Sequence, residues 1–254
     1  MEFSVEVKDK IRVIRFARPQ RKNAMTFAMY VGIAEAINGA NTDDNTNIVV
    51  LTGDGDYFSS GNDLNNYMNV QDISVIEQAC EMVRNYVAAF INCRKPLIAL
   101  VNGPALGISA TTLGLCDIVF ASEKAYFKTP FTTLGLSPEG CSSYLFPKIM
   151  GYAKANRMLY FSERMSSQEA LSVGLVTEIF PDDLFWSKAW EKVKEWVELP
   201  VNSLIASKDL VRSQELAILH KANDEECDKL LSRIQSEDCV EAALKFFTNK
   251  KSKI

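Results

Sequence analysis

Two loops of small residues and one carboxylate are the parts of this chain whose residue types and spacing could do chemistry. The loops are Phe58-Ser-Ser-Gly-Asn-Asp-Leu64 and Asn102-Gly-Pro-Ala-Leu-Gly-Ile-Ser109, and the carboxylate is Glu139 in Ser137-Pro-Glu-Gly-Cys-Ser-Ser143. Loops of this kind present backbone N–H groups to an anion, and a nearby carboxylate can then move a proton next to a polarised carbonyl. Together the three segments predict an enolate-forming enzyme.

The sequence offers little support for a histidine-dependent mechanism or for a zinc or calcium site. His220 is the only histidine and lies in a charged C-terminal segment far from both loops, so we interpret it as structural or solvated. The six cysteines form no Cys-x-x-Cys pair and have no partner histidines for zinc, so we expect reduced, mostly buried thiols. Asp54 and Asp56 lack the rest of a calcium-binding loop. We therefore expect no metal site.

Composition and charge exclude several classes of protein. The chain has 254 residues, of which 47% are hydrophobic and 24% charged, as in a folded protein with one large or two modest domains. A net charge of −4 with scattered Lys and Arg argues against a nucleic-acid-binding face. No apolar run approaches the ~20 residues of a membrane span, and Met1-Glu-Phe-Ser4 does not resemble a signal peptide. We expect a soluble protein without a nucleic-acid partner.

The elements that position the two loops alternate between strands and helices. Residues 4–8 and 11–16 alternate apolar and polar side chains around Asp9-Lys10, which predicts a hairpin. Thr26 is the expected N-cap of a helix to about Ala40. Further strands are expected at 48–52, 97–101, 118–121 and 175–180, and further helices at 73–90, within 107–115 and between about 141 and 161. This order predicts an α/β core with much parallel pairing.

The last third of the chain is helical almost throughout. Helices are expected at 182–197, 202–213, 221–234 and 237–247, and we place a boundary between a core at 1–198 and a helical region at 199–254. An apolar stripe must pack on the core or on another subunit, and both alternatives stay open. The stripe comprises Cys239, Ala242, Ala243, Phe246 and Phe247.

Both loops, in this order and at this separation, resemble the enoyl-CoA hydratase/isomerase (crotonase) superfamily. That family's patterns are close to Phe-Ala-Ala-Gly-Ala-Asp-Leu and Asn-Gly-x-Ala-Leu-Gly-Gly-Gly, and the resemblance extends from Arg18-Pro through Cys116-Asp117 and Gly174-Leu-Val176 to the helical end. It implies an α/β, crotonase-like spiral of ββα turns and a C-terminal region that assembles a homotrimer or a dimer of trimers. It also implies a fatty acyl-CoA substrate, so coenzyme A is part of the substrate and no separate cofactor is expected.

The resemblance also assigns the residues of the site. The oxyanion-hole N–H groups fall on Asn62 and Ile108, where Ile108 replaces a usual glycine and narrows the pocket. Arg18 and Arg21 are the candidate partners of the coenzyme A phosphates, and Thr129 and Pro130 are candidates for the acyl pocket. The predicted substrate-binding residues are Lys22, Ala24, Ser60, Gly61, Asn62, Asp63, Leu64, Gly107, Ile108 and Phe131.

The carboxylates decide which reaction the resemblance implies. The two positions that carry Glu in family hydratases read Thr111 and Phe131 here, so the chain should be a poor hydratase. Glu139 instead resembles the catalytic Glu of peroxisomal Δ3,Δ2-enoyl-CoA isomerases, in which one carboxylate moves a proton from C2 to C4. This activity converts 3-enoyl-CoA, cis or trans, to trans-2-enoyl-CoA in the β-oxidation of unsaturated fatty acids.

Such a proton shuttle calls for a sheltered carboxyl group. We expect apolar neighbours to raise the pKa of Glu139 toward about 6–7. Phe131, Leu134, Leu136 and Phe146 are the candidate neighbours. Glu139 could instead be an ordinary helix-start carboxylate after Pro138.

Two other functions and the cellular location complete the expectations. The alternatives are a non-catalytic acyl-CoA-binding module of the same fold, and a dienoyl-CoA isomerase, which would need a second carboxylate near Thr111. Ser252-Lys-Ile254 differs from the peroxisomal Ser-Lys-Leu signal by one isomeric side chain, and a frayed lysine-rich tail is the alternative. We expect the peroxisome, with the mitochondrion as a second location. The start of the fold near Ser4 also leaves room for a preceding acyl-CoA-binding domain.

Overall fold

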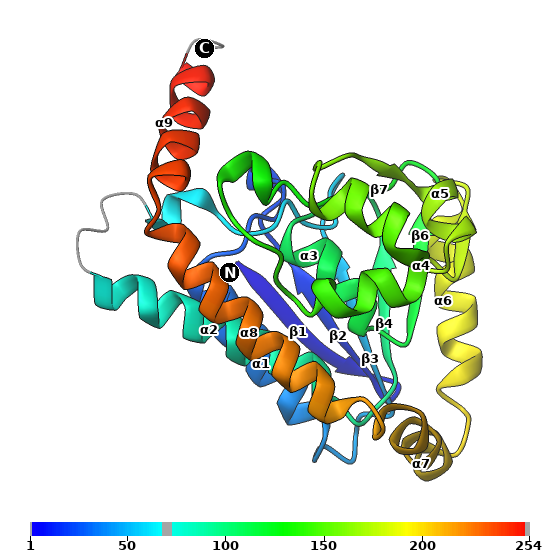
Figure 1. Cartoon of the computed structure of the whole chain (residues 1–254). Coiled ribbons are helices and arrows are strands. Elements are labelled where there is room, and N and C mark those ends of the chain that lie inside the picture. Colours follow the sequence, from blue (N-terminus) through cyan, green and yellow to red (C-terminus); the bar gives the residue numbers. More distant parts are fainter. Residues whose placement is uncertain (1, 68–72, 252–254) are drawn as a thin grey trace.

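A six-stranded sheet runs through the centre of the computed structural model, which describes residues 2–67 and 73–251 (Figure 1). Its strand order is β1-β2-β3-β4-β6-β9, in which β1 and β2 form the predicted hairpin and every later pair is parallel. A second sheet has the order β5-β7-β8. The strands are Phe3–Lys8, Ile11–Phe16, Ile48–Gly53, Leu97–Val101, Ala105–Leu106, Ile118–Ser122, Tyr126–Lys128, Met165–Ser166 and Glu178–Phe180 for β1 to β9.

The central strands are apolar on both faces because helices cover both. On β3, Val49 and Leu51 face the main core, which also takes in α1 and α2, whereas Ile48 and Val50 face a second core under α6. The continuous apolar runs at 48–52 and 97–101 are therefore those of buried parallel strands, as predicted. The sheet is a rigid base for the loops that leave its strand ends.

The short helix α5 was not predicted, and the other α-helices that the structure describes lie close to their predicted positions. Thr26 caps α1, since its side chain accepts a hydrogen bond from Met29 N–H. α8 begins five residues before the predicted start, and β5, β7 and β8, of two or three residues each, were not predicted. The helices α1 to α9 are Phe27–Ala40, Ile73–Ile91, Ile108–Thr111, Ser142–Leu159, Ser167–Ser172, Phe185–Trp196, Val201–Arg212, Leu216–Ile234 and Glu237–Lys251.

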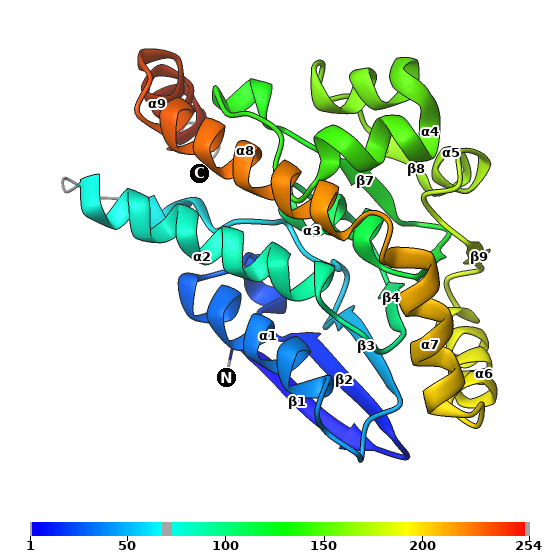
Figure 2. The same cartoon turned by 60° about the horizontal axis from the view of Figure 1, so that its bottom comes forward.

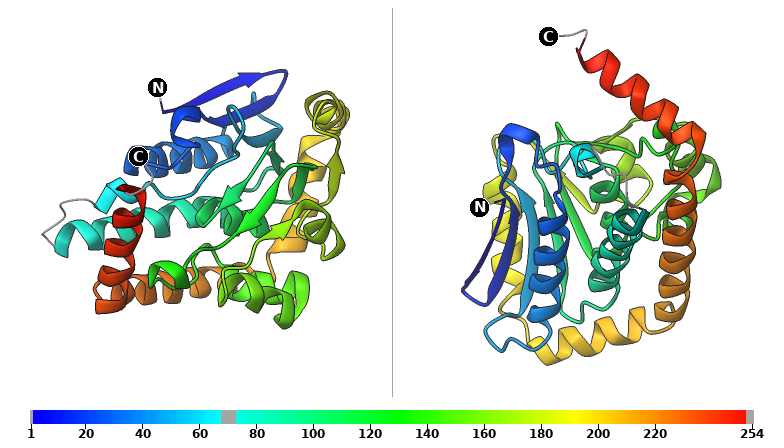
Figure 3. Two further views of the ribbon diagram at one scale, coloured as in Figure 1. Left: turned by 90° about the horizontal axis from the view of Figure 1, so that it is seen from above. Right: turned by 90° about the vertical axis from the view of Figure 1, so that its left-hand side faces the viewer.

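The C-terminal helices return to the sheet-bearing part of the protein. α8 lies along α2 and also contacts α4, as Figures 1 and 2 show from two sides. α9 contacts the protein near its start and then projects away from it (Figure 3). Cys239 packs there beside Gly135, whereas the side chains of 243, 246 and 247 and the tail 252–254 lie outside the described residues. The boundary between 198 and 199 stays a prediction.

Two expectations drawn from composition can be compared with the structure. All six cysteines are unpaired and five of them are buried, which confirms that most of them are buried, as predicted. Within residues 2–67 and 73–251, no helix combines the length and the apolar content needed to cross a membrane.

A candidate active site where two loops adjoin

The loops after β3 and β4 lie against each other through main-chain hydrogen bonds. Leu106 N–H donates to Ser59 O at 2.9 Å, and Ser59 N–H donates to Pro104 O at 3.3 Å. Gly61 is necessary for this approach, because it has φ +79° and a Cβ there would lie 2.5 Å from Leu106 O. The two predicted oxyanion loops are thus one surface, although they are more than forty residues apart in sequence.

The backbone N–H groups of Asn62 and Ile108 have no hydrogen-bond acceptor among the residues that the structure describes. The neighbours of Asn62 are engaged, since Met25 N–H donates to Gly61 O and Asp63 N–H donates to Met25 O. Ile108 begins α3 after Gly107, which has φ +59°, and its residue is fully buried. A buried backbone N–H normally has a partner, so two free donors on adjoining loops form a candidate site for an oxyanion.

The segment that carries Glu139 packs directly on α3. A Cβ added at Gly140 would lie 2.4 Å from Thr111 Oγ1 and 3.3 Å from Ile108 Cδ1. Glu139 itself is only 8% exposed, and its carboxylate has no hydrogen bond or ion pair within the described part of the chain. The structure therefore brings together Glu139 and the loop of Ile108, which are far apart in sequence.

Burial, and to a lesser extent the nearby carboxylate of Glu226 on α8, together raise the pKa of Glu139 to about 8. The predicted direction is confirmed, and the shift is larger than expected. Phe131 and Phe146 are buried in the main core, and Leu136 packs against it. The surroundings also include α2 and α8, because Glu139 interacts electrostatically with groups on both helices. These groups are Cys80, Tyr86 and Cys227.

The two positions where family hydratases carry Glu hold uncharged, buried side chains. Thr111 is fully buried and its hydroxyl donates to Ile108 O at 3.1 Å, beside the turn that follows Glu139. Phe131 is 3% exposed and belongs to the main core. Neither position therefore supplies a carboxylate, and Glu139 lies on the segment that packs against α3, the helix that Ile108 begins.

The predicted coenzyme A side of the site is also assembled. Ser60 N–H donates to Lys22 O at 2.9 Å, so 22–25 runs beside 60–63. The Asn23 amide is fully buried and donates to the carbonyls of Asp54, Tyr57 and Phe58, which joins this segment to the loop after β3. Leu64 starts a short 3-10 helix, and Gly107 N–H donates to Lys128 O.

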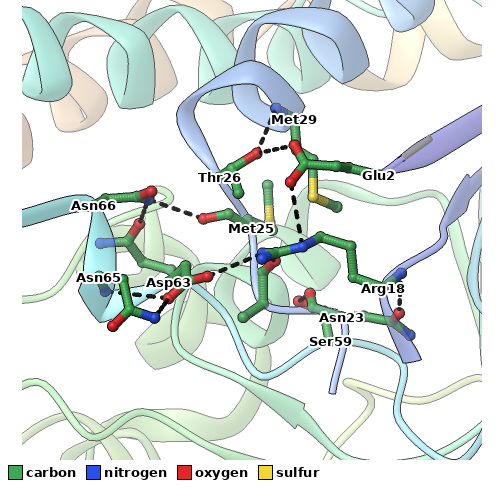
Figure 4. Close-up of polar contacts among 12 residues, drawn as sticks. Glu2, Arg18, Asn23, Met25, Thr26, Met29, Ser59, Asp63, Asn65 and Asn66 are labelled. Carbon is green, nitrogen blue, oxygen red and sulfur yellow. Dashed lines mark hydrogen bonds and ion pairs between the residues drawn. The ribbon is translucent and has the colours of Figure 1, made fainter. Parts of the chain in front are cut away.

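Arg18 is paired with carboxylates inside the protein, and its predicted role as a phosphate partner stays a prediction. Figure 4 shows its guanidinium between Asp63, at 3.0 Å, and Glu2, at 3.4 Å, and it also donates to Ala24 O. Burial alone would raise the pKa of Asp63, but hydrogen bonds from Asn65 and Arg18 lower it overall. Arg18 thus holds the loops together, and Arg21 stays exposed.

Glu226, His220 and one surface groove complete the comparison with the sequence. Glu226 was not predicted, because it is one of several acidic residues on a C-terminal helix and no sequence signal distinguishes it. The His220 ring lies 2.9 Å from Asn92 Oδ1, in keeping with a structural role. A surface groove of about 800 Å³ is lined by β1, β2 and α6, including Trp186 and Trp190, and shares no residue with the site loops.

The fold and the site define a crotonase-type α/β protein with a pair of free backbone donors and a buried carboxylate. The model of the enoyl-CoA hydratase/isomerase family matches residues 6–253, and the chain belongs to that family.

Individual proteins agree with this assignment. The chain is 49% identical over 244 residues to enoyl-CoA delta isomerase 2 of Rattus norvegicus, covering 94% of this chain but only 62% of the rat protein. It is 45% identical to the protein named enoyl-CoA delta isomerase 3, peroxisomal, of Mus musculus, covering 97% of this chain and 78% of that one. A crystal structure of an enoyl-CoA hydratase/isomerase from Pseudoalteromonas atlantica T6c superposes with a TM-score of 0.89 at 32% identity, over 98% of both chains.

The raised pKa of Glu139 predicts how its replacement changes stability with pH. The folded protein holds this proton up to about pH 8, whereas the ordinary pKa of a Glu side chain is 4.5, so ionisation destabilises the fold as the pH rises between those values. Glu139→Gln removes this penalty. Relative to the unmodified protein, the variant should gain on the order of 3 kcal/mol in free energy of unfolding between pH 5 and pH 8.

Urea unfolding at several pH values measures this difference. Glu225→Gln is the matched control, because it removes an exposed carboxylate from the same helix as Glu226. A gain for Glu139→Gln that does not change with pH would contradict the buried, proton-holding carboxyl group.

Proposed function

We propose that the protein is an enoyl-CoA isomerase that converts 3-enoyl-CoA, cis or trans, to trans-2-enoyl-CoA. The observation that carries the proposal is a buried carboxyl group, Glu139, which has no hydrogen-bond partner in the described residues and lies on the segment packed against α3. The N–H groups of Asn62 and Ile108, on the two adjoining loops, also lack acceptors within those residues. The rat and mouse relatives named as isomerases support it. Because the chain spans about 62% of the rat relative, the activity of a longer protein is part of the proposal.

The proposed reaction is a proton shift through a dienolate. The ionised Glu139 removes a proton from C2; the electron pair of that C–H bond forms a C1–C2 double bond, and the thioester oxygen gains a negative charge. The N–H groups of Asn62 and Ile108 donate to this oxygen, a role in which one lost donor typically costs on the order of 100- to 1000-fold in rate. Glu139 then returns the proton to C4: the electron pair of the C3–C4 double bond forms the C4–H bond, the pair of the C1–C2 double bond forms the C2–C3 double bond, and the oxyanion restores the carbonyl, so no atom is gained or lost.

The absence of a second carboxylate at Thr111 favours isomerisation over hydration and over the dienoyl-CoA reaction. Water addition needs one group to activate water and another to protonate the α-carbon, whereas a 1,3-shift needs one group used twice. A pKa near 8 suits this dual use, since the group can both take and give a proton near neutral pH. With Arg18 engaged by Asp63, Arg21 and Lys22 are the cations left for the coenzyme A phosphates.

Isomerisation is tested by mixing the protein with a 3-enoyl-CoA and following the ultraviolet absorbance of the conjugated 2-enoyl thioester. We expect turnover whose kcat/KM rises with pH through an apparent pKa near 8. Glu139→Gln should lower kcat by at least about 1000-fold, because no other carboxyl group replaces it, with acyl-CoA binding retained. Binding without turnover by the unmodified protein across several chain lengths would instead identify a non-catalytic acyl-CoA-binding module.

The peroxisome is the proposed location. It draws on the name of the mouse relative and on the similarity of Ser252-Lys253-Ile254 to a peroxisomal signal, although these residues lie outside the described part of the chain. A fluorescent protein fused before residue 1 should co-localise with a peroxisomal marker. Deletion of 252–254 should release it to the cytosol, and Ile254→Leu should keep it in place. Mitochondrial localisation of the unmodified fusion would refute the proposal.

A homotrimer is the proposed assembly, alone or as a dimer of trimers. Large apolar side chains are exposed on the two helices α7 and α9, and burial against another copy would stabilise them. These side chains are Leu210, Val211, Val240 and Leu244. Light scattering coupled to gel filtration should give the mass of three or six chains, and paired replacement of Val240 and Leu244 by Asp should reduce it. A monomeric mass for the unmodified protein would exclude this assembly.

A further inference from the structure

The turn that follows Glu139 is held in an unusual conformation by a side chain from a distant helix. Gly140 and Cys141 both have positive φ, 72° and 59°, and Cys141 is a non-glycine residue at the N-cap of α4 that makes no side-chain cap. A residue in this region costs of order 1–3 kcal/mol and persists only where its surroundings hold it. Cys141 N–H donates to Glu226 Oε2 at 2.7 Å, and Ser143 N–H donates to Glu226 Oε1 at 2.8 Å.

Glu226 therefore does for α4 what a capping side chain normally does from within the helix. The first N–H groups of a helix have no partner inside it, and a carboxylate there also interacts favourably with the helix dipole. Glu226 is 6% exposed, and its carboxylate has no cation partner within the described residues. Both of its oxygens are used by the turn that carries Glu139.

The position of Glu226 is set by contacts between α8 and α2. The Arg84 guanidinium binds Asp224 and Asp228, which flank Glu226 on α8, and Asn223 Nδ2 donates to Arg84 O at 3.0 Å. These ion pairs and this hydrogen bond fix α8 against α2, and α8 in turn places Glu226 at the turn. Replacement of the Glu226 side chain should therefore alter the conformation of the turn, and with it the position of Glu139.

The charge of Glu226 also acts on Glu139 directly. Burial raises the pKa of Glu226, and hydrogen bonds from Ser143 and Cys141 oppose that increase. The other titratable groups that interact with Glu139 are Cys80 and Tyr86 on α2 and Cys227 on α8, and burial raises the pKa of each, so all three are neutral near pH 7. The facing residue of α3, Thr111, is uncharged.

We propose that Glu226 is a positioning residue for the reaction, closing the turn that carries Glu139 and placing a negative charge behind the reacting carboxyl group. The inference deepens the proposed function and rests on it. It assigns two effects to one side chain: the geometry of Glu139, through two hydrogen bonds, and its protonation, through charge.

Two variants separate these effects. Glu226→Gln removes the charge and leaves one acceptor oxygen in place of two, so its kcat also falls. The effect of the charge is seen in the acid limb of the kcat/KM–pH profile, which should move down by about one pH unit. Glu226→Asp keeps the charge but shortens the side chain. The limb should then stay in place, while kcat falls by about 10- to 100-fold with KM within about threefold of the unmodified value. Glu225→Gln, which removes an exposed charge from the next position, should change neither.

A titration without turnover distinguishes failure of this inference from failure of the proposed function. The stability gain of Glu139→Gln over its parent levels off at the pH that matches the folded-state pKa of Glu139. This pH is measured with and without Glu226→Gln, and it should fall by about one unit in the Glu226→Gln background. If the unmodified protein does not isomerise 3-enoyl-CoA, the proposed function fails, and this shift still supports or overturns the influence of Glu226 on Glu139.

An unchanged acid limb and an unchanged titration in folded Glu226→Gln would overturn the proposal. If Glu226→Gln does not fold, as judged by circular dichroism, Glu226→Asp decides. A limb that moves in that variant, or a kcat equal to that of the unmodified protein, would likewise overturn it.

Discussion

The site depends on a carboxyl group kept out of water with no cation beside it among the residues that the structure describes. A carboxylate in such a place is destabilised relative to its protonated form, so burial, together with the charge of Glu226, moves the pKa of Glu139 to about 8. The cost can be sustained because the surrounding core is large and well packed, with the sheet buried on both faces. Stability elsewhere in the fold supports a locally unfavourable group at the site.

The parallel sheet explains why the free N–H groups belong to the main chain of two loops. Parallel strands end at a common edge, and the loops after β3 and β4 pair with each other there through Ser59 and Leu106. Main-chain donors held by a sheet and by packed glycines cannot rotate away as side chains can, so little reorganisation is needed when charge develops. Gly61 permits the close contact, and Asn23 joins the loop to the segment at 22–25.

The elements that were predicted well are those that a local pattern of residues determines. β4 was predicted to the residue because its five side chains are all apolar, and α1 was predicted from Thr26 because an N-cap leaves a local signal. The roles of Glu139, Asn62 and Ile108 came from motif resemblance and stay predictions. Arg18 and Glu226 depend on partners 45 and 85 residues away, so an exposed cation or an ordinary helix carboxylate was the natural interpretation of each. Strands of two residues carry too little periodicity to be recognised.

The contact between Glu226 and the turn at Cys141 has a consequence for the order of folding during synthesis. The strands and loops of the site lie N-terminal to residue 142, so they leave the ribosome well before α8, and domains generally begin to fold from the N-terminal side as they emerge. Until α8 docks on α2, the N–H groups of Cys141 and Ser143 lack their carboxylate acceptor. A nascent chain without α8 would therefore hold all the strands that the structure describes, but the turn at Gly140 and Cys141 would lack its support, so α8 completes the candidate site as well as the surface.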